Sequence, residues 1–195
     1  MNIALFGTSA DPPSIGHQQI LQWLEQHYDR VWVWVSNNPF KTHQASLSDR
    51  LKMMELTIAA IKPPTQNIYL YPELSYPRTI HTVEAAKKIL PHPTYTLVIG
   101  SDLIQQLPTW YRAQELLTQV QLLVIPRQGV TIAQSDIERL NDLGTQVAIA
   151  PESTSIPNVS SSDYRNSGNS SVIIPTVAAY IQQESLYACQ TSPAP

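Results

Sequence analysis

The sequence predicts an α/β domain with a doubly wound, mainly parallel sheet, and three observations point to it. Six short runs of apolar, β-branched or aromatic residues are typical of buried strands. Segments with apolar residues at helical spacing lie between these runs. Strands and helices alternate along the chain, which is the pattern of a parallel sheet with helices on both faces.

The expected elements follow one another in chain order. The expected strands are residues 2–6, 31–35, 68–71, 96–99, 121–125 and 147–149. Expected helices begin near Ile15 or Gly16, after an N-cap at Ser48, near Thr79, before Leu116–Leu117 and near Ile137. Because ligands of such sheets bind beyond the carboxyl ends of the strands, the first candidate segments are residues 7–17, 36–41, 100–102 and 126–127.

Composition limits the function classes that fit. The length of 195 residues predicts a single domain over residues 1–187, followed by a disordered tail at 188–195. A formal net charge of -3 argues against a nucleic-acid-binding surface, although a local basic pocket for a small anion stays compatible with it. No run approaches the length of about 18 apolar residues typical of a membrane span, so we expect no membrane association. The lone cysteine, Cys189, and the absence of a signal-peptide pattern indicate a cytoplasmic protein.

Several common catalytic motifs are absent. The six glycines form neither GxGxxG nor GxxxxGK[ST], so dehydrogenase and P-loop interpretations lose their main support. There is no GxSxG elbow, no HExxH and no CxxC pair, so hydrolase and zinc-enzyme interpretations also lose theirs. No metal site built from protein residues is predicted.

The segment from Gly7 to His17 follows the first strand and opens the first helix. A helix N-terminus offers free backbone N–H groups and a positive dipole end, which suit a phosphate. Gly7 would let the backbone approach a ligand, Gly16 would leave room above the helix start, and His17 would point toward the same anion. A hydroxyl-rich turn with a capping histidine is an equally good interpretation of the residues alone. Further along, residues 152–171 are rich in Ser and Asn, and composition alone favours a surface loop there.

Two motifs carry a resemblance to a known family. The turn Gly7-Thr8-Ser9-Ala10-Asp11-Pro12-Pro13-Ser14-Ile15-Gly16-His17 resembles the (T/H)xGH signature of the nucleotidyltransferase α/β-phosphodiesterase superfamily, roughly G-G-T-F-D-P-x-H-x-G-H. Ser14 stands where the first histidine of that signature usually lies. Residues 159–165, V-S-S-S-D-Y-R, resemble its second signature, I-S-S-T-x-I-R. That signature opens a helix that grips the ATP phosphates from the other side, so the resemblance replaces the loop expected there with a helix start.

Other segments are similar to one branch, the nicotinate-nucleotide adenylyltransferases. The similar segments are Asn38-Pro39-Phe40-Lys41 with Arg50 and Met53, Gly100-Ser101-Asp102, Leu107 to Tyr111 with Leu116-Leu117, residues 125–129, and residues 174–187. The resemblance covers residues 1–187 and implies a Rossmann-like fold. Thr79 and Thr82 fit a T-x-x-T segment of this branch, whereas Arg78 and His81 depart from its usual Tyr and its usual Asp or Asn.

The implied reaction is transfer of the adenylyl group of ATP to nicotinate mononucleotide, giving nicotinate adenine dinucleotide and pyrophosphate in NAD biosynthesis. The attacking phosphate has a second pKa of about 6 and is largely ionised at neutral pH, so no general base is required. Both substrates are anionic, and alignment and electrostatic stabilisation carry most of such chemistry. Mg²⁺ would arrive with ATP and bridge phosphate oxygens.

The resemblance also implies roles for particular residues. The implied catalytic residues are His17, Lys41 and Arg165. The implied ATP-binding residues are Gly7, Thr8, Ser9, Ser14, Gly16, His17, Gly100, Asp102, Ser160, Ser161, Ser162 and Arg165. The implied residues for the nicotinate nucleotide are Lys41, Thr79, Trp110, Tyr111 and Arg127. Each has an ordinary alternative: a helix cap for His17, Asp102 and the serines, a surface charge for the basic residues, and a core position for Trp110.

Three rival functions remain open from the sequence. Two are enzymes of the same fold, nicotinamide-mononucleotide and pantetheine-phosphate adenylyltransferases, and the block around Trp110 favours the pyridine-nucleotide branch over the second. The third is a nucleotide-binding protein without turnover, which Ser14 motivates and which the retention of His17, Lys41 and Arg165 disfavours. Homo-oligomerisation is left open by the sequence.

Overall fold

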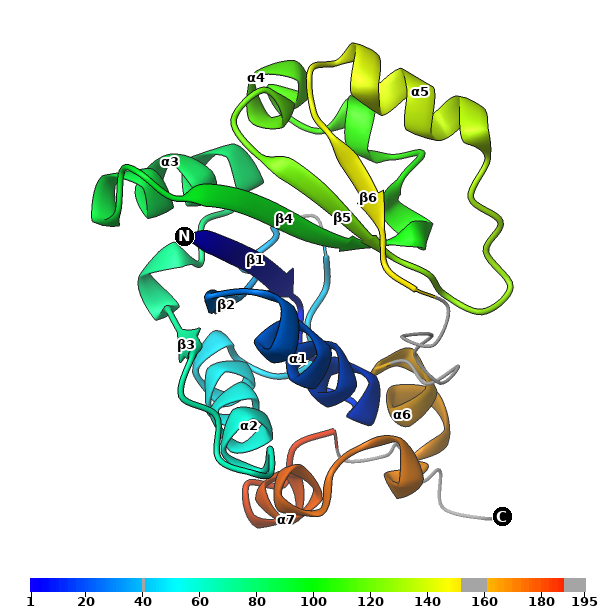
Figure 1. Cartoon of the computed structure of the whole chain (residues 1–195). Coiled ribbons are helices and arrows are strands. Elements are labelled where there is room, and N and C mark those ends of the chain that lie inside the picture. The colour runs from blue at the N-terminus through cyan, green and yellow to red at the C-terminus, as the bar shows by residue number, and fades with distance from the viewer. Residues whose placement is uncertain (40, 152–160, 188–195) are drawn as a thin grey trace.

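The computed structural model describes residues 1–39, 41–151 and 161–187, and these form a six-stranded sheet with helices on both faces (Figure 1). The strands are β1 (Asn2–Thr8), β2 (Arg30–Val35), β3 (Ile68–Leu70), β4 (Thr94–Gly100), β5 (Gln121–Ile125) and β6 (Val147–Ile149). Their order in the sheet is β3-β2-β1-β4-β5-β6, and every neighbouring pair is parallel. The doubly wound parallel sheet and all six predicted strands are confirmed.

Seven α-helices lie within the described residues. They are α1 (Ile15–His27), α2 (Leu47–Ala59), α3 (Thr79–Ile89), α4 (Ala113–Leu117), α5 (Gln134–Asp142), α6 (Ser161–Ser167) and α7 (Pro175–Gln183). Short 3-10 helices span Pro72–Leu74, Ser101–Leu103, Leu107–Thr109 and Ser170–Val172. The starts predicted for α1 and α3 are confirmed, and α5 begins three residues before the predicted Ile137.

The N-cap predicted for α2 was wrong by two residues. Ser46 caps this helix, because its Oγ accepts a hydrogen bond from the backbone N–H of Asp49 at 3.1 Å. Ser48 lies within the first turn. Two serines of similar capping propensity, Ser46 and Ser48, lie close together in this segment, so local sequence alone did not separate them.

Alternation along the strands fills two cores, one on each face of the sheet. On one face, Ile3 and Leu5 of β1 pack with residues from α3, α4 and α5. On the other face, Ala4 and Phe6 pack with residues from α1 and α2. The order of strands reverses at β1, which lies between β2 and β4. In such sheets the crevice beyond the carboxyl ends of the strands at this point is the usual ligand site.

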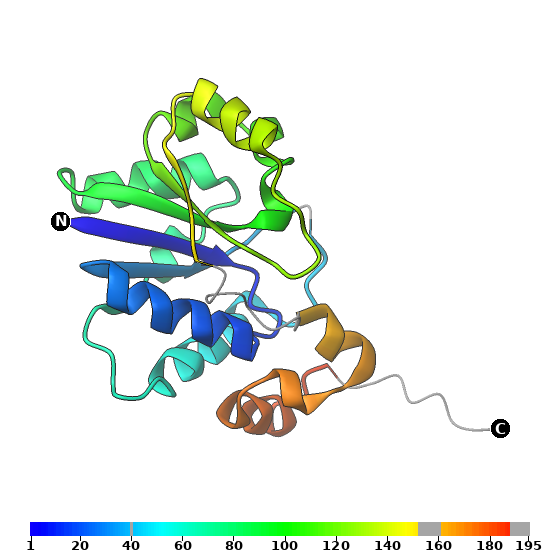
Figure 2. The same cartoon turned by 45° about the vertical axis from the view of Figure 1, so that its right-hand side comes forward.

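The C-terminal helices form a third packed unit beside the sheet. Val172, Val177 and Ile181 are buried together with Ala45 and Met53, so α7 packs against α2 and the loop before it. Figure 2 shows α6 and α7 gathered at the carboxyl ends of β1 and β2. The predicted tail at 188–195 lies outside the described residues. In the described part of the chain, no helix has the length and apolar character needed to cross a membrane.

Candidate active site

His17 lies in the first turn of α1 and is held by the turn that precedes it. Its Nδ1 accepts a hydrogen bond from the backbone N–H of Ser14 at 2.9 Å and lies 2.9 Å from Ser14 Oγ. Its Nε2 lies 2.8 Å from Thr8 Oγ1 at the end of β1. Because a backbone N–H can only donate, Nδ1 is the acceptor and the ring proton resides on Nε2. The ring therefore presents an N–H donor beside the carboxyl end of β1.

The electrostatic surroundings keep this imidazole neutral. Burial, and after it the positive charge of Arg127, lowers the pKa of His17 to about 4. A neutral ring with its proton on Nε2 donates one hydrogen bond without a charge that would need solvation. Helix capping and a donor facing the end of β1 thus coexist in His17, since Nδ1 caps the helix and the Nε2–H donates to Thr8 Oγ1.

Two buried charged residues fix the turn between β1 and α1. Arg50 of α2 is 2% exposed, and its Nη1 donates to the carbonyl oxygens of Ser9 at 2.8 Å and Ser36 at 2.9 Å. The same guanidinium donates through Nε to the carbonyl of Ala45 at 3.2 Å. Asp11, also 2% exposed, accepts hydrogen bonds from the backbone N–H groups of Gln44 and Ala45. The segments that follow β1 and β2 are therefore joined by buried polar contacts.

The start of α6 closes the other side of this turn. Ser161 Oγ donates to the carbonyl of Pro12 at 2.7 Å, and Arg165 Nη1 donates to the carbonyl of Asp11 at 2.5 Å. Arg165 Nη2 donates to Ser162 Oγ at 3.0 Å, which orients the guanidinium along the helix. The structure thus brings the two predicted signature segments together and confirms a helix at Ser161–Ser167. Ser160, the remaining predicted member, lies outside the described residues.

A third group of predicted residues follows β4 and β5. Arg127 Nε pairs with Asp102 Oδ1 at 3.0 Å, and the backbone N–H of Arg127 donates to Ser101 Oγ at 2.9 Å. A Cβ on Gly100 would lie 2.4 Å from Asp102 Oδ1 and 2.8 Å from Arg127 Nε. Gly100 is therefore needed for this ion pair. The charge of Arg127 acts on His17, which links this group to the turn.

The glycine at the start of the turn also has a role in the packing of the sheet. A Cβ on Gly7 would lie 2.2 Å from Cζ2 of Trp34, a buried residue of β2. Gly7 thus makes room for an indole ring in the core, and this packing accounts for the glycine without a ligand. Gly16 is buried in the first turn of α1.

Basic residues of the loop after β2 extend the site. Lys41 is exposed, and its backbone N–H donates to the carbonyl of Asn38 at 3.2 Å. His43 is half-buried, and among the described residues its Nε2 is buried without a hydrogen-bond partner. Burial lowers the pKa of His43, followed by the charge of Arg50 and smaller effects of Lys41 and Arg165, while Asp11 opposes them. Cations from three segments therefore surround one ring.

Three of the residues predicted for the pyridine nucleotide, Thr79, Trp110 and Tyr111, lie on the α3–α4 side. Thr79 opens α3, Trp110 is half-buried against the core, and Tyr111 is exposed. The guanidinium carbon of Arg78 lies 5.4 Å from the centroid of the Tyr111 ring, and the His81 ring lies 6.0 Å from it. The start of α3 thus lies beside Tyr111, and the two residues that depart from the family pattern, Arg78 and His81, make the contacts.

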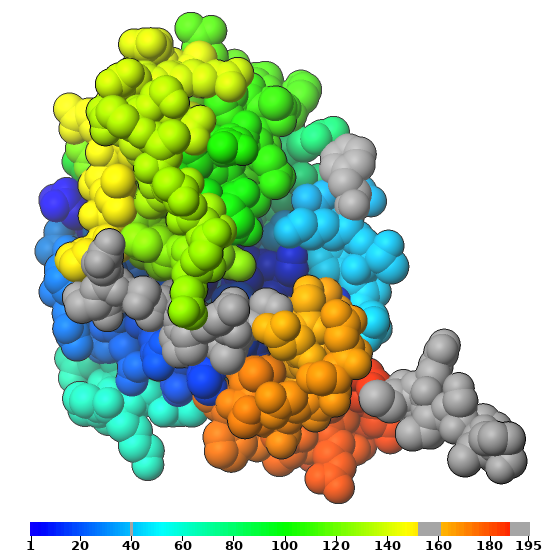
Figure 3. Space-filling model, turned by 90° about the vertical axis from the view of Figure 1, so that its right-hand side faces the viewer, coloured from blue at the N-terminus to red at the C-terminus, as the bar shows by residue number. Residues whose placement is uncertain are grey.

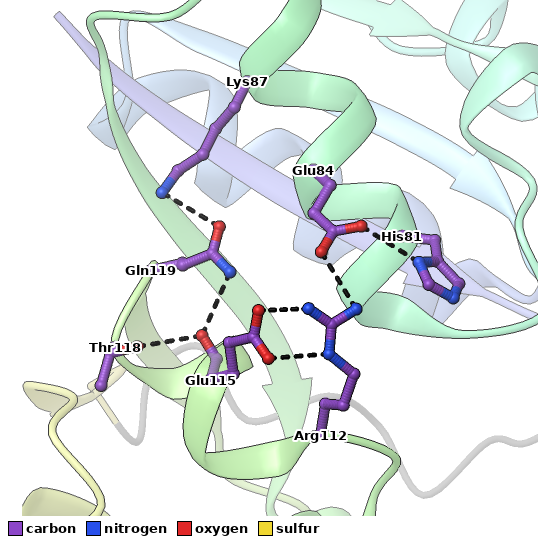
Figure 4. A network of polar contacts seen from close by, with 7 residues as sticks. All are labelled: His81, Glu84, Lys87, Arg112, Glu115, Thr118 and Gln119. Carbon is purple, nitrogen blue, oxygen red and sulfur yellow. Dashed lines mark hydrogen bonds and ion pairs between the residues drawn. The ribbon is translucent and has the colours of Figure 1, made fainter.

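A polar network behind these residues joins α3 to α4 (Figure 4). His81 Nδ1 contacts Glu84 Oε2 at 3.1 Å, and Arg112 Nη1 contacts Glu84 Oε1 at 3.2 Å. Arg112 Nε also donates to Glu115 Oε2 at 2.7 Å. The side chains in these pairs are 33% to 50% exposed, so solvent screens them.

The space-filling view shows how these segments are arranged around the turn (Figure 3). The dark-blue N-terminal segment is recessed between the green segment above it, the cyan segment beside it and the orange α6 below it. The carboxyl ends of β1, β2, β4 and β5 and the start of α6 thus meet around one hollow. The side chains that these segments place around the hollow are mainly hydrogen-bond donors and cations, which suits a polyphosphate.

Sequence reasoning missed four residues of this arrangement as site residues: Asp11, His43, Arg50 and Tyr187. Asp11 and Arg50 carried a signal, because each is a charged residue within a segment that resembles the family. Tyr187 lies in the segment of resemblance at residues 174–187, but nothing in the sequence indicates that its hydroxyl donates to Asp11 Oδ1, 176 positions away. His43 lies two residues beyond the segment of resemblance that contains Lys41, and only the fold places its ring among the cations.

Comparison with known proteins agrees with this geometry. The cytidylyltransferase-like family matches residues 5–167 of the chain. The chain therefore belongs to this family of nucleotidyltransferases, whose match includes the turn before α1 and the helix α6.

Similarity to individual proteins narrows the family to nicotinate-nucleotide adenylyltransferases. A probable nicotinate-nucleotide adenylyltransferase of Synechocystis sp. is 40% identical, covering 96% of this chain and 99% of the relative. One from Neisseria meningitidis is 30% identical, with 95% and 98% covered. The nicotinic acid mononucleotide adenylyltransferase of Plasmodium falciparum, solved in complex with NaAD, has the same fold, with a TM-score of 0.80, 22% identity, and coverage of 96% and 97%.

Proposed function

We propose that the protein transfers the adenylyl group of ATP to nicotinate mononucleotide and releases pyrophosphate. The observation that carries the proposal is the meeting of His17 and Arg165, from opposite ends of the chain, at the turn that follows β1. An N–H donor and a guanidinium beside a helix N-terminus match the charge that a triphosphate brings. The names of the relatives support the choice of reaction and substrate.

In the proposed reaction, a phosphate oxygen of nicotinate mononucleotide attacks the α-phosphorus of ATP. A P–O bond to the acceptor forms while the bond between the α-phosphorus and the bridging oxygen breaks, and that electron pair leaves with pyrophosphate. The attacking oxygen is already ionised at neutral pH, so no residue has to remove a proton. The protein's task is to align two anions and to offset their repulsion.

The residues of the site suit this task in different ways. The Nε2–H of His17 would donate to an α-phosphate oxygen, where negative charge develops. Lys41 and Arg165 would hold the polyphosphate, together with the Ser161 and Ser162 hydroxyls at the start of α6. Among the described residues, Nε2 of His43 has no hydrogen-bond partner, and such a buried polar atom is costly unless a ligand satisfies it, which supports an anion bound here.

On the other side, Asp102 would accept from a ribose hydroxyl and Arg127 would contact the acceptor phosphate. Trp110 would stack on the pyridine ring, and the backbone near Thr79 and Tyr111 would bind its carboxylate. Trp110 and the backbone near Thr79 and Tyr111 lie where α3 and α4 approach each other. These residues together favour a pyridine nucleotide over a phosphopantetheine arm as the acceptor.

Mg²⁺ fits this proposal as part of the substrate. Among the described residues, no group of three His, Cys, Asp or Glu side chains could hold a metal ion, and Asp102 is paired with Arg127. The phosphate oxygens of ATP would supply the ligands, and the ion would neutralise part of their charge. Removal of Mg²⁺ with EDTA should abolish turnover, and excess Mg²⁺ should restore it.

Pyrophosphate release from Mg-ATP with each acceptor in turn tests the proposal. We expect the highest kcat/KM with nicotinate mononucleotide, with the dinucleotide product identified by mass. A preference for nicotinamide mononucleotide or phosphopantetheine would contradict the substrate, and no release with any acceptor would contradict the reaction. Lys41→Met should weaken turnover, whereas Lys52→Met, which removes an exposed lysine paired with Glu55 on α2, serves as its matched control.

A further inference from the structure

The carboxylate of Asp11 has three donors that come from two distant parts of the chain. The backbone N–H of Gln44 donates to Oδ2 at 2.9 Å, and the backbone N–H of Ala45 donates to Oδ1 at 3.1 Å. The hydroxyl of Tyr187 donates to Oδ1 at 2.6 Å. The hydrogen bond from Tyr187 is the shortest of the three. It is also the only one of the three that a conservative side-chain substitution can remove.

The same residue also touches the opposite wall of the site. The backbone carbonyl of Asp11 accepts from Arg165, and the next carbonyl along, that of Pro12, accepts from Ser161. Asp11 therefore joins the turn before α1, the loop before α2 and the start of α6. Any shift of this residue moves the backbone that orients Arg165.

Tyr187 contacts two of the segments that meet at Asp11. Burial and the neighbouring Asp11 carboxylate raise the pKa of its phenol well above the ordinary value, so the hydroxyl keeps its proton and donates. Its ring meets that of Tyr164, the residue before Arg165, edge-on at a centroid distance of 5.8 Å. Tyr187 thus contacts the turn through its hydroxyl and α6 through its ring.

We propose that Tyr187 is a positioning residue for the ATP polyphosphate, which acts by fixing Asp11 and through it the turn at residues 7–17 and the guanidinium of Arg165. This inference rests on the proposed function, because it assigns the polyphosphate to that site. Groups that bind a transition state gain from being held in place before the substrate arrives, and the contacts behind them supply that order. Tyr187 itself need not touch the substrate.

A second tyrosine of the same C-terminal unit offers a matched control. The Tyr180 hydroxyl, on α7, donates to Asp49 Oδ1 on α2 at 3.0 Å. This bond has the same chemistry and also fastens the C-terminal unit to the body of the protein. Asp49, however, has no contact with the turn at residues 7–17 or with Arg165 among the hydrogen bonds of the described residues.

The test compares Tyr187→Phe with Tyr180→Phe in the full-length protein. For each variant, thermal unfolding, ATP affinity by calorimetry without acceptor, and KM for ATP and for nicotinate mononucleotide are measured. We expect Tyr187→Phe to weaken ATP affinity and kcat/KM for ATP by roughly tenfold, the scale of one hydrogen bond to a charged group. The KM for the acceptor should change much less, and Tyr180→Phe should lower only the unfolding temperature.

Equal effects of the two substitutions, or unchanged ATP affinity in Tyr187→Phe, would overturn the inference. If Tyr187→Phe does not fold, Asp11→Asn replaces it, because it keeps the size of the side chain while removing the charge and turning one of the two accepting oxygens into an N–H donor. Selective loss of ATP affinity in that variant supports the inference, and a loss of stability alone overturns it. If the wild-type protein releases no pyrophosphate, the proposed function fails, yet the ATP affinities of the variants still decide the role of Tyr187.

Discussion

The two sides of the candidate site are held together by different kinds of contact. Around the turn at residues 7–17, Asp11, Ser14 and Arg50 are buried, and the hydrogen bonds of Asp11 and Arg50 join segments far apart in the sequence. On the α3–α4 side, Arg112 forms exposed ion pairs with Glu84 and Glu115. Buried contacts to charged groups define one geometry, whereas exposed pairs contribute little and are screened by salt. The phosphate side is thus preorganised, and the pyridine side is free to adjust.

The largest expected effect is on folding. Arg50→Met would leave the carbonyls of Ser9, Ser36 and Ala45 without their donor, so we expect a loss of about 3–5 kcal/mol in the free energy of unfolding. Urea unfolding measures this value. Lys52→Met, on the exposed face of the same helix, should stay within about 0.5 kcal/mol of wild type. A similar small loss for both variants would show that the buried network does not hold the phosphate side.

The next effect is on catalysis. His17→Ala removes the Nε2–H donor that lies beside Thr8, and loss of such a donor to the transition state costs about 10²-fold to 10³-fold in kcat. Steady-state pyrophosphate release measures it. His27→Ala, at the other end of α1 and stacked on Trp23, is the control and should leave kcat unchanged. Unchanged turnover in His17→Ala would remove His17 from the mechanism.

A smaller effect is expected at the position where this chain departs from the family signature. Ser14→Ala removes the hydroxyl beside His17 Nδ1 but leaves the backbone N–H that also donates to it. The ring should keep its tautomer, so we expect kcat to fall only about fivefold, consistent with the loss of one hydrogen bond. A loss as large as that of His17→Ala would mean that Ser14 itself contacts the phosphates.

On the other side of the site, Arg112→Ala tests the exposed network of Figure 4. We expect the unfolding temperature to fall by about 1–2 °C at low salt, and by less at high salt, because solvent and ions already screen these pairs. Differential scanning calorimetry at two salt concentrations measures the change. A fall that is large and independent of salt would contradict the contrast between the two sides.

The last expected outcome is that His17 does not titrate near neutral pH. The folded pKa of His17, about 4, lies below its unfolded value of about 6.5, so folding releases a proton in this window. His17 therefore contributes stability above pH 6.5 that is lost as the pH falls toward 4. By NMR, its ring should stay neutral from pH 5 to 8 in the ligand-free protein. Unfolding at pH 7 and 4.5 should show a larger loss on acidification for the wild type than for His17→Ala.

The sequence predicted most of the fold because local signals were consistent. The six strands are short apolar runs, and their alternation with helices dictates a parallel sheet. The N-cap of α2 was misplaced because Ser46 and Ser48 offer the same local chemistry, and only the structure shows which one contacts Asp49. The start of α6 followed from the family signature, since composition alone favoured a loop there.

The sequence predicted several residues of the site but not the contacts between them. The resemblance named His17, Arg165 and Asp102, and the structure places each beside a carboxyl end of the sheet or at the helix that faces it. The contacts that hold the site together are long-range. Arg50 bonds to the turn, Arg127 pairs with Asp102, and Tyr187 bonds to Asp11. Such pairs leave no local pattern, because each depends on where the whole chain brings its backbone.

The bond between Tyr187 and Asp11 also has a consequence for how the protein is made. The turn at residues 7–17 leaves the ribosome early, and the sheet from β1 to β6 is synthesised before Arg165 and Tyr187 emerge. Domains tend to fold as their chain is synthesised from the N-terminus. A nascent chain that has formed the sheet would still lack one wall of the phosphate site, so tight nucleotide binding should begin only once synthesis has passed the C-terminal helices.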